Sequence, residues 1–287
     1  MPVIEQILAE LQRLNETLER LAPKAAPEVD FTEVAFRWSR EASGAALIPV
    51  PRHRPGNLDD LRGIDLQKDI LDRNTRQFLK GFPCNNALLW GSRGTGKSSL
   101  IRALLDTYRD QGLRMIEVDR AHLQDIPVIC HKIAGRSERF IIFLDDLAFE
   151  ENNGSFKTLK AAVEGSLAET PENVLIYATS NRRHLMPEFH SENRAARMVD
   201  GELHHGETVE EKISLSERFG VWLSFHPFSQ DQYLEIVEHW IHRLGGKDPI
   251  CKVREEALAH ALMRGSRSGR VAHQFAKDWT GRKRLTE

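Results

Sequence analysis

Short apolar runs alternate with segments of helical periodicity through the middle of the chain. The runs at 87–90, 113–118, 140–144, 174–179 and 221–225 each have the length of a buried strand. Helical patterns occupy 65–81, 97–110, 126–134 and 155–169. Strands that are separated by helices are typical of a parallel sheet covered on both faces. We therefore predict an α/β core over residues 57–227, built on a parallel sheet of five strands flanked by helices.

The pattern changes on either side of this core. After residue 227 the strands stop, and helices are predicted over 229–244, 254–263 and 271–279, which indicates a small all-helical C-terminal domain over 228–287. Residues 1–56 are predicted to form an N-terminal helix and a linker, with three prolines between residues 49 and 55 favouring an extended loop.

The N-terminal helix is predicted over residues 2–22, where apolar residues recur at spacings of three and four. This spacing places them at the a and d positions of three heptads: Ile4, Ile7, Leu11, Leu14, Leu18 and Leu21. Pro23 and Pro27 end the pattern. The helix either docks on its own domain or forms a coiled coil with another copy, and the sequence leaves both open.

Composition narrows the class of protein. The 287 residues include 40 basic and 42 acidic side chains, and 40% are hydrophobic. A net charge of −2 excludes a wholly basic nucleic-acid coat, and no apolar run approaches the ~20 residues of a membrane span. The three cysteines follow no metal-ligand spacing. We expect a globular cytoplasmic protein without a membrane partner.

The strongest chemical motif lies directly after the first predicted strand. Residues 91–98 read GSRGTGKS and match G-x-x-x-x-G-K-[ST], a loop whose backbone N–H groups surround phosphates at a helix N-terminus. Lys97 is expected to reach the β- and γ-phosphates, and the Ser98 hydroxyl to ligate Mg²⁺. The predicted nucleotide contacts of this loop are Ser92, Arg93, Gly94, Thr95, Gly96, Lys97, Ser98 and Ser99.

A pair of carboxylates ends the third predicted strand. Asp145 and Asp146 follow the apolar run at 140–144, at the sheet edge where α/β proteins bind ligands. We expect Asp145 to hold Mg²⁺ through water and Asp146 to orient or deprotonate the attacking water. The cofactors implied are ATP and Mg²⁺.

Four segments in this order resemble the AAA+ ATPases over about residues 58–279. Residues 61–65 (LRGID) resemble the segment that packs on adenine, which implicates Gly63 and Ile64. Residues 177–181 (YATSN) resemble sensor 1, with Asn181 beside the lytic water. Residues 216–220 (SERFG) and 268–270 (SGR) resemble the arginine-finger segment and sensor 2. The resemblance implies that Arg218 reaches a neighbouring subunit's γ-phosphate and that Arg270 contacts phosphate from a helical lid.

Within the AAA+ ATPases, the amino-acid sequence at residues 61–65 and 86–100 is similar to that of an uncharacterised bacterial family. Most AAA+ proteins end this strand in Asp-Glu, whereas paired Asp occurs in the helicase-loader and initiator branches, which favours a slow ATPase. The resemblance implies a homo-oligomer that binds ATP and ADP and remodels an unknown macromolecular client. The alternative is a nucleic-acid-associated loader or adaptor that uses ATP as an assembly switch.

Two further stretches carry weaker signals. Residues 182–212 form a polar insert with five basic residues, seven acidic residues and four histidines, which favours a partner-contacting loop over a zinc site. Residues 264–287 hold seven basic residues against two acidic ones, so contact with nucleic acid is possible on charge alone. The alternative to nucleic-acid contact is that this stretch forms a solvent-exposed helix that carries Arg270.

Overall fold

The computed structural model describes residues 29–41, 44–53, 55–147, 171–181, 197–199, 202–204 and 219–286, together with positions 7, 10, 13 and 14. Several predictions lie wholly or mostly outside these residues: the helices at 2–22 and 155–169, the 182–212 insert, and Arg218. Within the insert, β7 (Arg197–Val199) and β8 (Glu202–His204) pair antiparallel. Among the described residues, no helix has the length and apolar character that crossing a membrane requires.

The main sheet has seven strands in the order β2-β1-β4-β5-β6-β3-β9. The five predicted strands are all present and mutually parallel. They are β3 (Ala87–Gly91), β4 (Leu113–Glu117), β5 (Arg139–Leu144), β6 (Val174–Ser180) and β9 (Val221–Phe225). β3 has a neighbouring strand on each side, β6 and β9, so the loop that follows β3 lies between the ends of those two strands.

The predicted count of five strands is wrong, because residues assigned to a linker add two more. β1 (Ala35–Glu41) pairs parallel with β4, and β2 (Gly44–Pro49) pairs antiparallel with β1. Phe36 and Trp38 alternate with exposed Arg37, so both aromatic side chains are buried. This alternation of buried and exposed residues is the sequence pattern that could have predicted β1. It is too short to do so alone, because the strand finds its partner strands only in the folded chain.

Helices cover both faces of the sheet. α2 (Asp65–Leu79) and α3 (Lys97–Tyr108) pack in one hydrophobic cluster, and α4 (Ile126–Ile133) packs in a second. In β5, Ile141 and Phe143 belong to the first cluster, while Phe140 and Ile142 belong to the second. Because successive side chains of a strand point to opposite faces, this division places the two clusters on opposite sides of the sheet.

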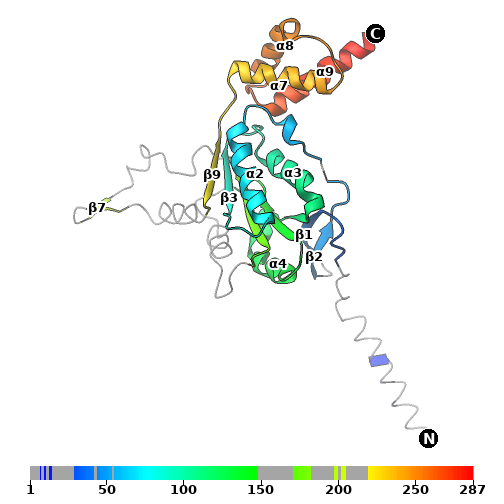
Figure 1. Ribbon diagram of the computed structural model, residues 1–287, viewed down its shortest axis with the longest axis vertical. Coiled ribbons are helices and arrows are strands. Elements are labelled where there is room, and N and C mark those ends of the chain that lie inside the picture. Colours follow the sequence, from blue (N-terminus) through cyan, green and yellow to red (C-terminus); the bar gives the residue numbers. More distant parts are fainter. Residues whose placement is uncertain are drawn as a thin grey trace.

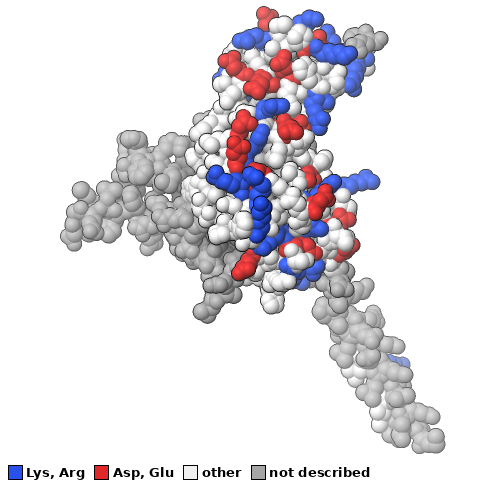
Figure 2. Space-filling view, in the orientation of Figure 1, with Lys and Arg blue, Asp and Glu red and all other residues white. Residues whose placement is uncertain are grey.

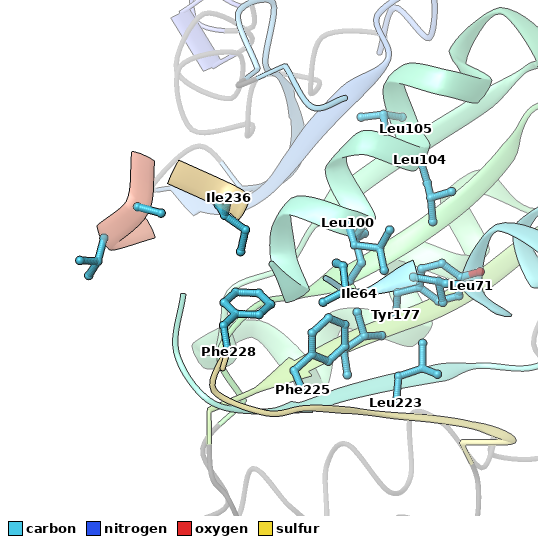
Figure 3. Close-up of a cluster of buried hydrophobic side chains, with 14 of the residues drawn as sticks. Ile64, Leu71, Leu100, Leu104, Leu105, Tyr177, Leu223, Phe225, Phe228 and Ile236 are labelled. Carbon is cyan, nitrogen blue, oxygen red and sulfur yellow. The ribbon is translucent and has the colours of Figure 1, made fainter. Parts of the chain in front are cut away.

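Three helices follow β9 and gather at one end of the molecule (Figure 1). They are α7 (Gln230–Arg243), α8 (Ile250–Met263) and α9 (Gly269–Thr286); the last two begin earlier than predicted, and α9 also ends later. Figure 3 shows Phe228 and Ile236 directed toward Ile64 and Leu100. These helices therefore share the hydrophobic cluster of α2 and α3.

The N-terminal hairpin is held to the core by a buried carboxylate. Asp125 is 2% exposed and accepts hydrogen bonds from Trp38 Nε1 at 2.9 Å and Arg40 Nη2 at 2.8 Å. We expect Asp125→Ala to lower the free energy of unfolding by about 1–3 kcal/mol, since it leaves the buried indole N–H without an acceptor. Urea denaturation measures this.

The matched control is Glu117→Ala, which removes the carboxylate that pairs with Arg37 at 3.3 Å on the surface. An exposed pair of this kind contributes about 0–1 kcal/mol. Equal losses in the two variants would contradict the role assigned to Asp125.

Candidate phosphate and metal site

The loop between β3 and α3 is shaped by glycines that have no room for a side chain. Gly91 has a φ of 121°, and a Cβ there would lie 2.1 Å from the carbonyl oxygen of Phe225. Gly94 has a φ of 75°, and a Cβ there would lie 2.9 Å from Ser268 Oγ. The sequence motif therefore requires glycine for two reasons, a left-handed backbone and close approach to β9 and to the start of α9.

Lys97 is the first residue of α3, and only 5% of it is exposed. Its Nζ donates to the carbonyl oxygens of Gly91 at 2.9 Å and Ser92 at 2.7 Å. Burial lowers the pKa of Lys97 to about 8, although the carboxylates of Asp146 and Asp145 act in the opposite direction. The ammonium thus rests on the loop with its charge poorly solvated, which favours an incoming anion.

Asp145 gathers three side chains from two different elements. Its Oδ1 accepts from Ser98 Oγ at 2.6 Å and from Thr179 Oγ1 at 2.7 Å, and its Oδ2 lies 3.3 Å from Arg102 Nη2. Ser98 and Asp145 were the two predicted metal ligands, and they are 47 residues apart in the chain. Their hard oxygen donors fit Mg²⁺, which prefers hydroxyl, carboxylate and water ligands.

Asp146 and Asn181 are also brought together. Asn181 Nδ2 donates to Asp146 Oδ1 at 2.5 Å, and the Asp146 backbone N–H donates to Thr179 Oγ1 at 2.9 Å. Asp146 has a φ of 55°, a left-handed conformation that non-glycine residues adopt rarely. The turn after β5 thus aims an exposed carboxylate beside the end of β6.

The segment at 61–65 lies against the phosphate loop and the start of the C-terminal helices. Ile64 is 4% exposed, and its Cδ1 lies 3.3 Å from where a Cβ on Gly96 would stand. A Cβ on Gly63 would lie 3.2 Å from Phe228 Cε1. The structure therefore places Ile64 beside the loop, and it places Gly63 against Phe228, just before α7.

The start of α9 touches the phosphate loop. The Arg270 backbone N–H donates to the Gly94 carbonyl at 3.4 Å, and Ser268 is 5% exposed beside the same glycine. The Arg270 side chain is exposed, and its charge contributes to lowering the pKa of Lys97. Hence Arg270 lies within electrostatic range of the site.

The remaining loop residues divide into inward and outward groups. Thr95 is 3% exposed, and its hydroxyl donates to the Ser92 carbonyl at 2.7 Å. Arg93 and Ser99 are exposed, and Arg93 also contributes to lowering the pKa of Lys97.

The cations around the loop are Arg93, Lys97, Arg102 and Arg270, against the two carboxylates of Asp145 and Asp146. This excess of positive charge suits a polyphosphate. The glycine-lined loop at the N-terminus of α3 adds backbone donors of the kind that phosphates bind. The arrangement thus fits a nucleotide with an attached divalent cation.

Sequence reasoning missed three residues of this arrangement: Thr179, Arg102 and Ser268. Arg102 lies four residues after Ser98 on α3, so the helical period places both on one face. Thr179 falls inside the YATSN segment, where Asn181 drew attention instead. Among the described residues, no group of three or more His, Cys, Asp or Glu side chains could hold a metal ion.

Comparisons with known proteins agree with this architecture. A search of curated protein sequences found no match. Thermotoga maritima RuvB, the Holliday junction branch migration motor, superposes with a TM-score of 0.52 at 16% identity. That match covers 78% of this chain and 64% of RuvB, so the chain spans less than two thirds of its relative.

Aeropyrum pernix ORC1, solved in complex with DNA, superposes with a TM-score of 0.50 at 20% identity, covering 74% of this chain and 58% of ORC1. Likeness at these identities establishes the fold alone. A family model described as protein of unknown function (DUF815) matches residues 32–283. The chain shares its fold with RuvB and ORC1, and it belongs to the DUF815 family.

Proposed function

We propose that this protein is a Mg²⁺-dependent ATPase of the AAA+ type that couples nucleotide state to remodelling or assembly of a macromolecular client. The observation that carries the proposal is the convergence of Ser98 and Asp145, with a 2.6 Å hydrogen bond at the mouth of the glycine loop. An ordinary glycine-rich turn gives no reason for a carboxylate from another strand to meet the first turn of the following helix.

Each side chain then has a defined role. Lys97 leaves the carbonyls of Gly91 and Ser92 to bind the β- and γ-phosphates. Ser98 and Asp145 hold Mg²⁺, whose charge offsets that of the phosphates. Asp146, positioned by Asn181, orients or deprotonates the attacking water. Gly63 and Ile64 contact the base.

The test is direct. Binding of a fluorescent ATP analogue and release of phosphate are measured with Mg²⁺ and with EDTA. Nucleotide binding together with Mg²⁺-dependent phosphate release supports the proposal. A protein that binds no nucleotide at any concentration refutes it.

We further propose that residues 228–287 act as a lid over the nucleotide. Support comes from the contact between Gly94 and the start of α9, which brings Arg270 beside the glycine loop. Asp60, which follows the loop at 50–57, also pairs with His239 at 3.0 Å and Arg243 at 3.3 Å on α7. These helices therefore contact both the glycine loop and the segment that precedes residues 61–65. Residues 57–227 serve as the nucleotide-binding core, to which β1 and β2 are added.

A shared active site follows from the resemblance of residues 216–220 to an arginine-finger segment. We propose that the protein works as a homo-oligomer in which Arg218 reaches the γ-phosphate held by a neighbouring subunit. A guanidinium suits this role because it is always protonated and donates in a planar fork. Arg218→Ala is expected to bind ATP and lose most of its turnover.

Mixing Arg218→Ala protein with Lys97→Ala protein is then expected to restore part of the phosphate release, because each variant supplies the part that the other lacks. Wild-type turnover per subunit should also rise with protein concentration. A mixture that forms mixed oligomers and stays inactive would contradict a finger supplied in trans.

A nucleic-acid-associated loader is the second candidate. It draws on the likeness to ORC1, which was solved in complex with DNA, and to RuvB, a Holliday junction branch migration motor. Exposed Arg264, Arg267 and Lys277 add positive charge to the same end of the chain. Other basic residues of α9 are engaged within the chain, since Arg282 pairs with Glu256 and Asp278. Figure 2 shows both signs of charge mixed over these helices. Strong stimulation of phosphate release by single-stranded DNA would favour this candidate.

A further inference from the structure

Arg102 occupies an unexpected place beside the metal ligands of the proposed site. It lies one helical turn after Ser98 on α3, and its Nη2 is 3.3 Å from Asp145 Oδ2. The side chains of Arg102 and Asp145 are 29% and 32% exposed, so water screens this pair less than a fully exposed one.

The guanidinium of Arg102 packs over the aromatic ring of Phe143. Its central carbon lies 5.5 Å from the ring centroid of Phe143, a fully buried residue of β5 two positions before Asp145. A guanidinium over an aromatic face gains a cation–π attraction at this distance. Arg102 thus has a defined resting position, and that position points its donors at the carboxylate.

Asp145 is consequently satisfied without a metal. Ser98 and Thr179 donate to Oδ1, and Arg102 faces Oδ2, so both carboxylate oxygens already have partners. A divalent cation held by the same carboxylate would lie close to the permanently charged guanidinium of Arg102. Because like charges repel and share one counter-charge, the two cations oppose each other.

We propose that Arg102 is a metal-competing residue. It neutralises Asp145 in the metal-free protein and must withdraw from Oδ2 before Mg²⁺ is held, so it weakens the metal affinity of the nucleotide-bound site. The proposal rests on the nucleotide site proposed above. It implies that nucleotide can load without metal, since the remaining cations Arg93, Lys97 and Arg270 surround the glycine loop and can offset the phosphate charge.

The experiment measures Mn²⁺ binding to the full chain, with protein in excess over ADP, from the loss of the free Mn²⁺ signal in electron paramagnetic resonance. Arg102→Gln and Arg102→Met remove the charge and keep a long side chain over Phe143, whereas Arg102→Lys keeps the charge. Arg76→Gln is the matched control, since Arg76 pairs with Asp72 at 2.9 Å on α2, outside the site. ADP affinity in EDTA is measured for every variant.

We expect Arg102→Gln and Arg102→Met to bind Mn²⁺ about fivefold more tightly than the wild type. Arg102→Lys and Arg76→Gln should remain close to the wild type. ADP affinity in EDTA should not rise, so the two affinities separate a specific effect from general damage, which would weaken both. If Gln does not fold at this position, Met provides the same comparison.

Equal or weaker Mn²⁺ binding by the charge-free variants, with ADP still bound, overturns the role of Arg102 and leaves the proposed function intact. A wild type that binds no ADP overturns the proposed function itself, and the competition with it. The two failures are therefore distinguishable.

Discussion

Asp146→Asn is expected to bind ATP as tightly as the wild type and to release phosphate about 10³-fold more slowly. Asparagine keeps the shape of the side chain and tolerates the φ of 55° that the turn imposes. It can still pair with Asn181, so the structure of the site should persist. What is lost is the negative charge that accepts or orients a proton of the attacking water, an effect of about 10²–10⁴ in general base catalysis.

Asp110→Asn is the matched control, because the carboxylate of Asp110 is 92% exposed in the short 3-10 helix Arg109–Gln111 that follows α3. Phosphate release under single-turnover conditions and binding of a fluorescent ATP analogue together provide the measurement. Should Asp146→Asn turn over at the wild-type rate, the water-handling role passes to another residue. Should it lose ATP binding instead, the carboxylate serves the structure of the loop.

Lys97→Ala is expected to weaken ATP binding by at least tenfold, or ~1.4 kcal/mol, because it removes a charge-assisted contact to phosphate. The wild type should also show a pH dependence that the variant lacks. The pKa of Lys97 is lowered to about 8 in the free protein, since burial disfavours its charge. Bound phosphate favours the charged form and so raises that pKa.

This difference in pKa between the free and the bound protein determines how ATP affinity changes with pH. Below about pH 8 Lys97 is charged in both states, and ATP affinity should be flat. Above pH 8 the free protein loses the proton that the complex retains, so affinity falls by up to about tenfold per pH unit. Equilibrium binding between pH 6.5 and 9.5 tests this, with exposed Lys80→Ala as the control. A wild-type affinity that does not change above pH 8 would contradict the assignment.

Much of the core could be read from local patterns. The apolar runs predicted all five parallel strands, because a strand covered on both faces is apolar along most of its length. The GSRGTGKS segment predicted the phosphate loop, since positive φ values and close backbone approach leave little choice but glycine. Asp145, Asp146 and Asn181 could be placed at one edge because parallel strands present their carboxyl ends together.

Other features depend on which segments meet in space. β1 and β2 were assigned to a linker, because a hairpin this short shows only a few alternating residues until β4 supplies its partner. The approach of Ser268 to Gly94 joins residues far apart in the chain, and no local pattern encodes that distance. Arg102 looks like any helix-surface arginine in the sequence. Its role depends on the ion pair with Asp145, which lies at the end of β5 beside the same face of α3. Such a long-range ion pair results from packing and cannot be predicted from helical periodicity.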